Sequence, residues 1–315
     1  MSSPLVSIIT PVFNGESYLA NAIESALSQS YSNFELLIIN DGSTDNSHHI
    51  IKTYLNDKRV HYFDKTNGGV ASARNHALRH AQGEYIGFLD QDDRWLPHKL
   101  ASQVDYLERH KKVALHYAKQ QVVDAHGVAS NFDWPTGASG YCLPEIFLRN
   151  KITILTTLVR KSVIEQVGFF NEALSGTDDY DMWLRILLKH PIHFDPQIVA
   201  EYRLHDKNVS LDSFKMTIRD LETITSFLSE HPESRSIIGP AIIRTRLFEL
   251  NAQLAAWYTW KNKNFKRARA HYLASIKQKP LQVQSYTRWL YCRLSDTQRR
   301  KLSWYHSKIN HWLQR

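Results

Sequence analysis

Three acids follow an apolar segment in the stretch GEYIGFLDQDDRWLPHKL (83–100). Asp90, Asp92 and Asp93 come directly after the apolar or small residues 85–89. Carboxylates this close together repel one another unless a cation lies between them. An Asp-x-Asp pattern at the end of a strand suits a hard divalent cation, Mg²⁺ or Mn²⁺, and no Cys/His cluster favours zinc. A capped turn with solvated acids is the alternative interpretation of the same residues.

These acids end one of several strand-like segments in the first half of the chain. Apolar and β-branched runs predict strands over 5–10, 34–40, 59–63 and 84–89, and segments with helical spacing of apolar residues follow them. This alternation predicts an α/β fold with a Rossmann-like, mainly parallel central sheet and helices on both faces. Ligands of such sheets bind at the carboxyl ends of the strands, where Pro11, Asp41 and Asp90 fall.

The second half changes in pattern and in charge. We expect strands over 152–159 and 198–205, an amphipathic helix over DYDMWLRILLKH (179–190) and helices from 211 onwards. This organisation predicts two domains, 1–212 and 213–315. Residues 231–315 hold 17 Lys and Arg and 3 acids, whereas residues 1–230 hold 22 basic and 28 acidic residues. Such asymmetry indicates two functional regions.

Composition limits the class of protein. Two cysteines, Cys142 and Cys292, are too few for a disulfide framework and are expected to be buried thiols in a reducing compartment. The N-terminal sequence MSSPLVSIITPVFNG does not resemble a signal peptide, and no apolar run approaches the ~20 residues of a spanning helix. We therefore expect a cytoplasmic protein that is soluble or bound to a surface.

The motifs occur in an order that resembles a known family. TPVFN (10–14), NDGSTD (40–45), NGGVASARN (67–75) and LDQDD (89–93) lie on successive strand-to-helix turns, and GTDDYDMWLRI and YRLHDKN follow. Over about residues 4–211 the chain resembles glycosyltransferase family 2, the inverting sugar transferases of the GT-A fold. The resemblance implies a nucleoside-diphosphate sugar donor, most often UDP-linked.

The same resemblance implies roles for residues at the donor site. Pro11, Phe13 and Asn14 match the segment that packs on the base and ribose, and Asp41 matches the acid that contacts the uracil edge. Gly68 permits close approach of the backbone. Asp90 matches an acid near the ribose, Asp92 a ligand of Mg²⁺ or Mn²⁺, and Arg74 a partner of the diphosphate. Core packing of Phe13, helix capping by Asp41 and pairing of Arg74 with an acid are the alternatives.

The family places its base in an acidic pair before a helix with Tyr and Trp. Alignment on Trp183 makes Asp179 the base, while Asp178 stands where the family usually has Glu, so either acid is a candidate. A helix N-terminus favours the ionised carboxylate that a base needs. Asp181 is expected to face solvent. Arg203 and His205 alternate on a strand end, and the family often has a metal-contacting or basic His near the diphosphate there.

The predicted function is transfer of one sugar to a hydroxyl of a glycan or a lipid-linked acceptor, as in polysaccharide or lipopolysaccharide biosynthesis. A nucleotidyltransferase and a non-catalytic sugar-nucleotide binder or scaffold are the alternatives. Segment 124–141 is expected to shape the acceptor site. The basic C-terminal region, with Trp289, Trp304 and Trp312, is expected to hold the protein on the anionic inner face of a membrane. A solvated helical face is the other interpretation, and no motif favours nucleic acid.

Overall fold

A computed structural model describes residues 3–132, 136–174, 176–206, 208, 211–299 and 301. The chain divides into two compact units. Unit 1 comprises residues 1–211 and 223–237, and unit 2 comprises residues 212–222 and 238–315. Trp304 and Trp312 lie outside the described residues, as do Trp134 and Pro135 of segment 124–141. In the described residues no helix combines the length and hydrophobicity needed to cross a bilayer.

Unit 1 contains one mixed sheet, and its described strands run in the order β3-β2-β1-β4-β7-β6-β8-β5. β1 to β4 are mutually parallel, β7 is antiparallel to both of its neighbours, β6 and β8 are parallel, and β5 is antiparallel to β8. The bounds are β1 (Val6–Val12), β2 (Phe34–Asn40), β3 (Val60–Asp64), β4 (Tyr85–Phe88), β5 (Arg94–Trp95), β6 (Leu115–Val123), β7 (Leu158–Arg160) and β8 (Ile192–Arg203).

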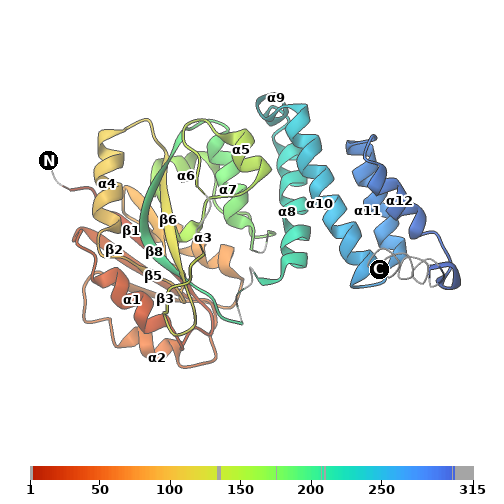
Figure 1. Cartoon of the computed structure of the whole chain (residues 1–315). Coiled ribbons are helices and arrows are strands. Elements are labelled where there is room, and N and C mark those ends of the chain that lie inside the picture. Colours follow the sequence, from red (N-terminus) through yellow and green to blue (C-terminus); the bar gives the residue numbers. More distant parts are fainter. Residues whose placement is uncertain are drawn as a thin grey trace. The chain divides into compact units, whose positions relative to one another are not determined.

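Helices surround this sheet, as Figure 1 shows. Every residue of β1 and β2 is buried, as expected for central parallel strands covered on both faces. Residues of α1 and α4 share one core with alternate residues of β1 and β2, and α3 packs on the same two strands outside that core. The helices of unit 1 are α1 (Leu19–Leu27), α2 (Ser47–Lys52), α3 (Val70–His80), α4 (Lys99–Arg109), α5 (Leu143–Leu148), α6 (Lys161–Val167), α7 (Asp178–Leu187), the second part of α8 (Ser213–Glu230) and most of α9 (Ser234–Ile238). The predicted α/β fold is confirmed.

The strand expected over 152–159 is wrong for most of its length. Residues Ile154–Thr156 form a 3-10 turn, η1, and only Leu158–Arg160 form a strand. Thr156 and Thr157 donate both their backbone N–H and their hydroxyl groups to the carbonyls of Thr153 and Ile154. These local bonds compete with a strand ladder, so the β-branched composition is misleading here. β6, whose buried residues include His116 and Gln120, was not anticipated.

Unit 2 is helical in its described residues. It contains the first part of α8 (Ser213–Glu230), α10 (Pro240–Trp260), α11 (Phe265–Gln278) and α12 (Val283–Tyr291). Phe214 stacks on Trp257 with ring centroids 3.6 Å apart, and the buried Tyr258 and Tyr272 form a small core with them. Cys142 in unit 1 and Cys292 in unit 2 are both buried free thiols, in agreement with expectation.

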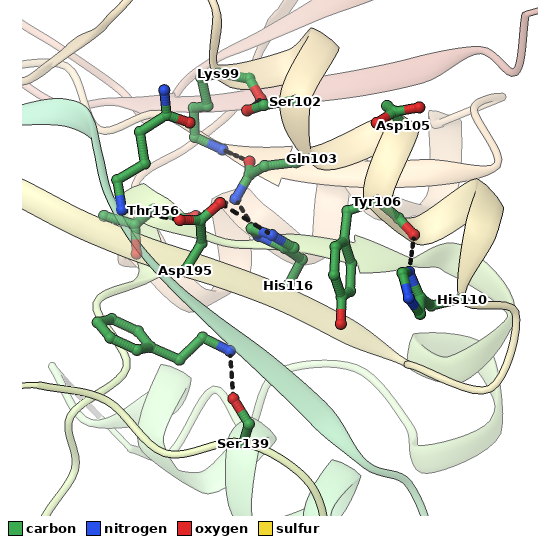
Figure 2. Close-up of polar contacts among 12 residues, drawn as sticks. Lys99, Ser102, Gln103, Asp105, Tyr106, His110, His116, Ser139, Thr156 and Asp195 are labelled. Carbon is green, nitrogen blue, oxygen red and sulfur yellow. Dashed lines mark hydrogen bonds and ion pairs between the residues drawn. The ribbon is translucent and has the colours of Figure 1, made fainter.

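A buried polar network in unit 1 joins α4, β6, β8 and η1 (Figure 2). Lys99 Nζ donates to Gln103 Oε1 at 2.6 Å and to the Thr157 carbonyl at 3.0 Å. Gln103 Nε2 donates to the Thr156 carbonyl at 2.8 Å and lies 3.0 Å from His116 Nδ1. Burial, and then the charges of His193 and Lys99, lower the pKa of His116 to about 3. His116 is therefore neutral in the folded protein at neutral pH.

The neutral state of His116 predicts an acid-sensitive fold. Between pH 6.5 and about 3 the unfolded chain binds a proton at this position and the folded chain does not, so stability falls as pH falls through this window. At pH 5 the loss is up to about 2 kcal/mol relative to pH 8. Urea unfolding at pH 8, 6.5 and 5 should show the wild type losing this stability relative to His116→Gln. Other titrating groups cancel in the difference, and parallel pH profiles would contradict the assignment.

Candidate functional site

The ends of β1, β2 and β4 bring three of the motifs to one edge of the sheet, because these strands are parallel. The loop after β1 is tied to the loop after β2. Asn14 N donates to Ser43 Oγ at 3.0 Å, and Thr44 N donates to Asn14 Oδ1 at 2.8 Å. Asn14 has a positive φ of 51°, a conformation that asparagine tolerates better than most residues. Asn14 therefore shapes this edge, whereas Pro11 is buried within β1.

Phe13 is held by a residue that the motif analysis did not single out. Phe13 N donates to Gln91 Oε1 at 2.8 Å, and Gln91 Nε2 donates to the Phe13 carbonyl at 3.0 Å. A side-chain amide both donates and accepts, so it satisfies both backbone groups. The Phe13 side chain is left 48% exposed. Gln91 stands between Asp90 and Asp92. An uncharged amide in an otherwise acidic segment is the sequence feature that could have indicated its structural role.

Asp41 is buried and holds the glycine turn before α3. Its Oδ1 accepts from Gly68 N at 2.9 Å and from Lys65 Nζ at 2.6 Å, and its Oδ2 accepts from Gly69 N at 2.8 Å. Gly69 has a φ of 87°, which favours glycine. Asp41 thus holds the turn before α3 and, among the described residues, makes no capping bond to α2, the helix that follows it in sequence; a direct contact with a base remains a prediction.

The guanidinium of Arg74, on α3, connects two acids from distant parts of the chain. Nη2 donates to Asp90 Oδ1 at 2.9 Å and Nη1 donates to Asp178 Oδ2 at 2.8 Å. Arg74 and Asp178 are buried, whereas Asp90 is partly exposed. Burial alone would lower the pKa of Arg74, but the charges of Asp90, Asp178 and Asp179 raise it above its ordinary value. The site therefore joins the end of β4 to the start of α7 through a permanent cation.

The two acids at the start of α7 differ in environment. Asp178 is buried against Arg74, whereas the partly exposed Asp179 accepts a hydrogen bond at 2.6 Å from Tyr180 N. Although its side chain is partly exposed, loss of water around the carboxyl and then the charge of Asp178 raise the pKa of Asp179 to about 7. Asp181 does not face solvent as expected: it is buried and accepts a hydrogen bond at 2.9 Å from Arg185 Nε, and the same guanidinium donates to the Val167 carbonyl at the end of α6. Asp179 is thus the more accessible carboxyl of the pair.

The segment after β8 meets the acidic segment after β4. His205 Nε2 lies 2.9 Å from Asp92 Oδ2, and the His205 ring stacks on Tyr18 with centroids 5.3 Å apart. Arg203 donates its backbone N–H to Asp93 Oδ1 at 2.8 Å and its Nε to the Asp92 carbonyl at 3.0 Å. Burial and the charges of Asp92 and Asp90 raise the pKa of Asp93 well above its ordinary range. Asp93 and Arg203 therefore fix the backbone that presents Asp92 and His205.

These contacts allow a test of the predicted divalent cation. Asp92 and His205 bring one carboxylate and one imidazole to the same point, and burial and Asp90 raise the pKa of Asp92. A cation between these side chains would relieve the repulsion between the acids. In the part of the chain that the structure describes, no cluster of three or more His, Cys, Asp and Glu side chains has the form of a complete metal site. Two protein ligands suit an ion that takes its remaining ligands from water and phosphate, as Mg²⁺ does.

The fold and this strand-edge site define an α/β protein of the GT-A class, and comparison with known proteins agrees. The model of the family "Glycosyl transferase family 2" matches residues 7–164. An uncharacterized glycosyltransferase of Haemophilus influenzae is 37% identical over 229 residues, which cover 69% of this chain and 86% of that protein. The chain belongs to glycosyl transferase family 2.

Other relatives are longer proteins. An uncharacterized glycosyltransferase of Rickettsia felis is 37% identical over 66% of this chain, and the chain spans 35% of its length. A chondroitin synthase of Escherichia coli is 31% identical over 66% of this chain and 30% of its own length. The chain thus spans about a third of the length of these two relatives.

Solved structures share the fold at low identity. TarS of S. aureus in complex with UDP-GlcNAc has a TM-score of 0.60 and 17% identity, over 90% of this chain and 91% of that chain. The mannosyltransferase PcManGT of Pyrobaculum calidifontis, in complex with GDP-Man and Mn²⁺, has a TM-score of 0.56 and 18% identity, over 92% and 82% of the two chains. At this identity the similarity establishes the fold.

The position of Arg74 predicts a large stability loss on its removal. Arg74→Met leaves buried Asp178 without its cation, a change that typically costs ~3–5 kcal/mol. Arg109→Met, which breaks the exposed pair with Asp105, is the matched control and should cost no more than about 1 kcal/mol. Urea unfolding measures both, and Arg74→Met/Asp178→Asn should recover part of the loss. Equal losses for the two arginine variants would show that Arg74 is not a structural cation.

Proposed function

We propose that the protein is an inverting glycosyltransferase that moves one sugar from a nucleoside-diphosphate sugar, UDP-linked, to a hydroxyl of a glycan or glycolipid. The observation that carries this proposal is the bridge from Asp90 through Arg74 to Asp178. It joins the acidic segment after β4 to the start of α7, so that a donor-binding segment and a candidate base belong to one site. Release of UDP in the presence and absence of acceptor tests transfer against simple binding.

The donor is proposed to lie along the carboxyl ends of β1, β2 and β4. Exposed Phe13 offers a flat surface for the base, and Gln91 holds its backbone in place. Asn14, Asp41 and Gly68 shape the neighbouring turns, and Pro11 belongs to their buried support. Arg203 and Arg74 are buried and bonded within the protein, and their positive charge is proposed to act on the diphosphate from beneath the site. The complex of TarS with UDP-GlcNAc supports a nucleotide sugar as the donor.

Asp179 is proposed as the general base. The acceptor oxygen attacks the anomeric carbon as the bond from that carbon to the diphosphate oxygen breaks, and the hydroxyl proton moves to the Asp179 carboxylate. The diphosphate leaves with the electron pair of the broken bond, and the configuration inverts. Partial exposure lets Asp179 meet an acceptor, whereas both the burial of Asp178 and its bond to Arg74 favour a supporting role.

Asp92 and His205 are proposed to hold Mg²⁺ or Mn²⁺ beside the donor diphosphate. Their side chains already meet at 2.9 Å, and Arg203 and Asp93 fix the backbone beneath them. When bound there, a divalent cation would offset negative charge on the departing diphosphate. The Mn²⁺ complex of PcManGT supports a divalent cation in this fold.

The acceptor is proposed to be a glycan or a lipid-linked sugar of polysaccharide or lipopolysaccharide synthesis, with residues 124–141 at its binding site. We also propose that the protein works in the cytoplasm, on the anionic inner face of a membrane. The excess of basic residues beyond position 230 supports such a surface, because each Lys or Arg near anionic lipid adds about 1 kcal/mol of attraction.

The base assignment predicts a clear difference between two variants. Asp179→Asn should bind UDP normally and lose transfer by ~10²–10⁴-fold, the usual contribution of a positioned base. Because the pKa of Asp179 is raised to about 7, kcat/KM of the wild type should increase as pH rises through this value. Asp178→Asn removes a neighbouring negative charge, so its acid limb should move to lower pH. A larger loss for Asp178→Asn than for Asp179→Asn would reverse the assignment.

The metal assignment predicts loss of cation-dependent donor binding. Asp92→Asn and His205→Gln should each weaken Mn²⁺-dependent UDP binding by about tenfold or more, since each removes one of two protein ligands. Calorimetric titration of UDP with and without Mn²⁺ measures this, with Asp105→Asn on the exposed face of α4 as the control. EDTA should abolish transfer. Full activity in EDTA, or unchanged Mn²⁺ dependence in both variants, would contradict the assignment of Asp92 and His205 as metal ligands.

A further inference from the structure

One face of α12 in unit 2 carries exposed apolar side chains. Val283, Tyr286 and Leu290 recur at helical spacing, and their side chains are 70%, 40% and 54% exposed. Leu281, directly before the helix, is 95% exposed. Ser285 and Cys292 on the opposite side are buried. α12 thus packs Trp289, Tyr291 and the following Cys292 on the core of its unit and leaves Val283, Tyr286 and Leu290 exposed.

Four exposed apolar side chains within ten positions form a contiguous group on the surface. Single exposed apolar residues are common, but a contiguous group usually marks a contact with another apolar phase. We call Leu281, Val283, Tyr286 and Leu290 the α12 stripe. A helix that places such residues on one face and polar residues beside them is typical of binding at a bilayer interface.

The charges near the stripe identify the partner. Lys277, Arg288 and Arg293 are exposed, and Lys279 is partly exposed. From 277 to 299 the described acid is Asp296, which is already bonded to Arg299. An apolar stripe beside uncompensated cations complements acyl chains beneath anionic headgroups. A nucleic acid would match the charges and leave the aliphatic side chains in water.

We propose that the α12 stripe enters the interfacial region of an anionic lipid bilayer, while Lys277, Lys279, Arg288 and Arg293 contact lipid phosphates. The inference rests on the membrane surface proposed as a partner, and it names the element that makes the contact. It requires no contribution from the catalytic residues, so the stripe and the transfer reaction are separable.

The test uses the full chain and vesicles of phosphatidylcholine with or without phosphatidylglycerol. We expect sedimentation with the anionic vesicles at low salt, and weaker sedimentation at high salt because the attraction is screened. Leu281→Gln/Val283→Gln/Leu290→Gln should reduce the partition coefficient by about tenfold or more. Leu55→Gln, which removes an exposed leucine of unit 1, should not change it. Transfer to a water-soluble acceptor, measured in parallel, should be the same in all variants.

The outcomes separate this inference from the proposals on which it rests. Undiminished binding by the triple variant overturns the role of α12 and leaves membrane association intact. No binding by the wild type overturns both, and absence of transfer in solution concerns the catalytic proposal alone. A fluorophore on Val283→Cys should shift to the blue on adding anionic vesicles. Emission that is already blue and does not respond would show that protein, from the same chain or a second copy, covers the stripe, and would also overturn the inference.

Discussion

The candidate site depends on one buried cation. Arg74 and Asp178 are 104 positions apart, yet they share a hydrogen bond of 2.8 Å, and the same guanidinium bonds to Asp90. A buried carboxylate is stable only beside a cation or several donors. Arg74 therefore also holds the site together, because without it the buried Asp178 carboxylate would lose its charge partner. The ion pairs of Arg74 with Asp90 and Asp178 thus hold the end of β4 close to the start of α7.

Side chains that imitate backbone groups hold the rest of the site. Asp41 accepts from the N–H groups of Gly68 and Gly69, and the Gln91 amide satisfies both backbone groups of Phe13. These loops have no ladder partner at the sheet edge, so their backbone polar groups need such partners. The consequence is a fixed frame in which the Phe13 ring is exposed and the Asp179 carboxyl is partly exposed.

The fold was predictable where local pattern and tertiary position agree. The apolar runs that became β1 and β2 are buried on both faces, and their order fixed the edge at which Asp41 and Asp90 lie. The strand predicted over 152–159 was wrong because the hydroxyl and N–H groups of Thr156 and Thr157 form local hydrogen bonds instead of ladder bonds. β6 was missed because its polar residues, such as His116, are buried in a network that only the tertiary structure creates.

The sequence predicted which residues belong to the candidate site, but not which structural role each of them has. Sequence order shows that Asp178 and Asp179 are adjacent and says nothing of which one meets Arg74. On a helix, consecutive side chains point in directions about 100° apart, so one acid of a pair can face a buried partner while the other faces outward. Here the cation balances Asp178, and in the described residues no cation lies within ion-pair distance of Asp179. The two adjacent acids thus differ in their surroundings, and the pKa that is raised to about 7 belongs to Asp179, the more exposed of the two. The ion pair of Arg74 with Asp178 thus sets the difference between the surroundings of the two acids in the protein without substrate.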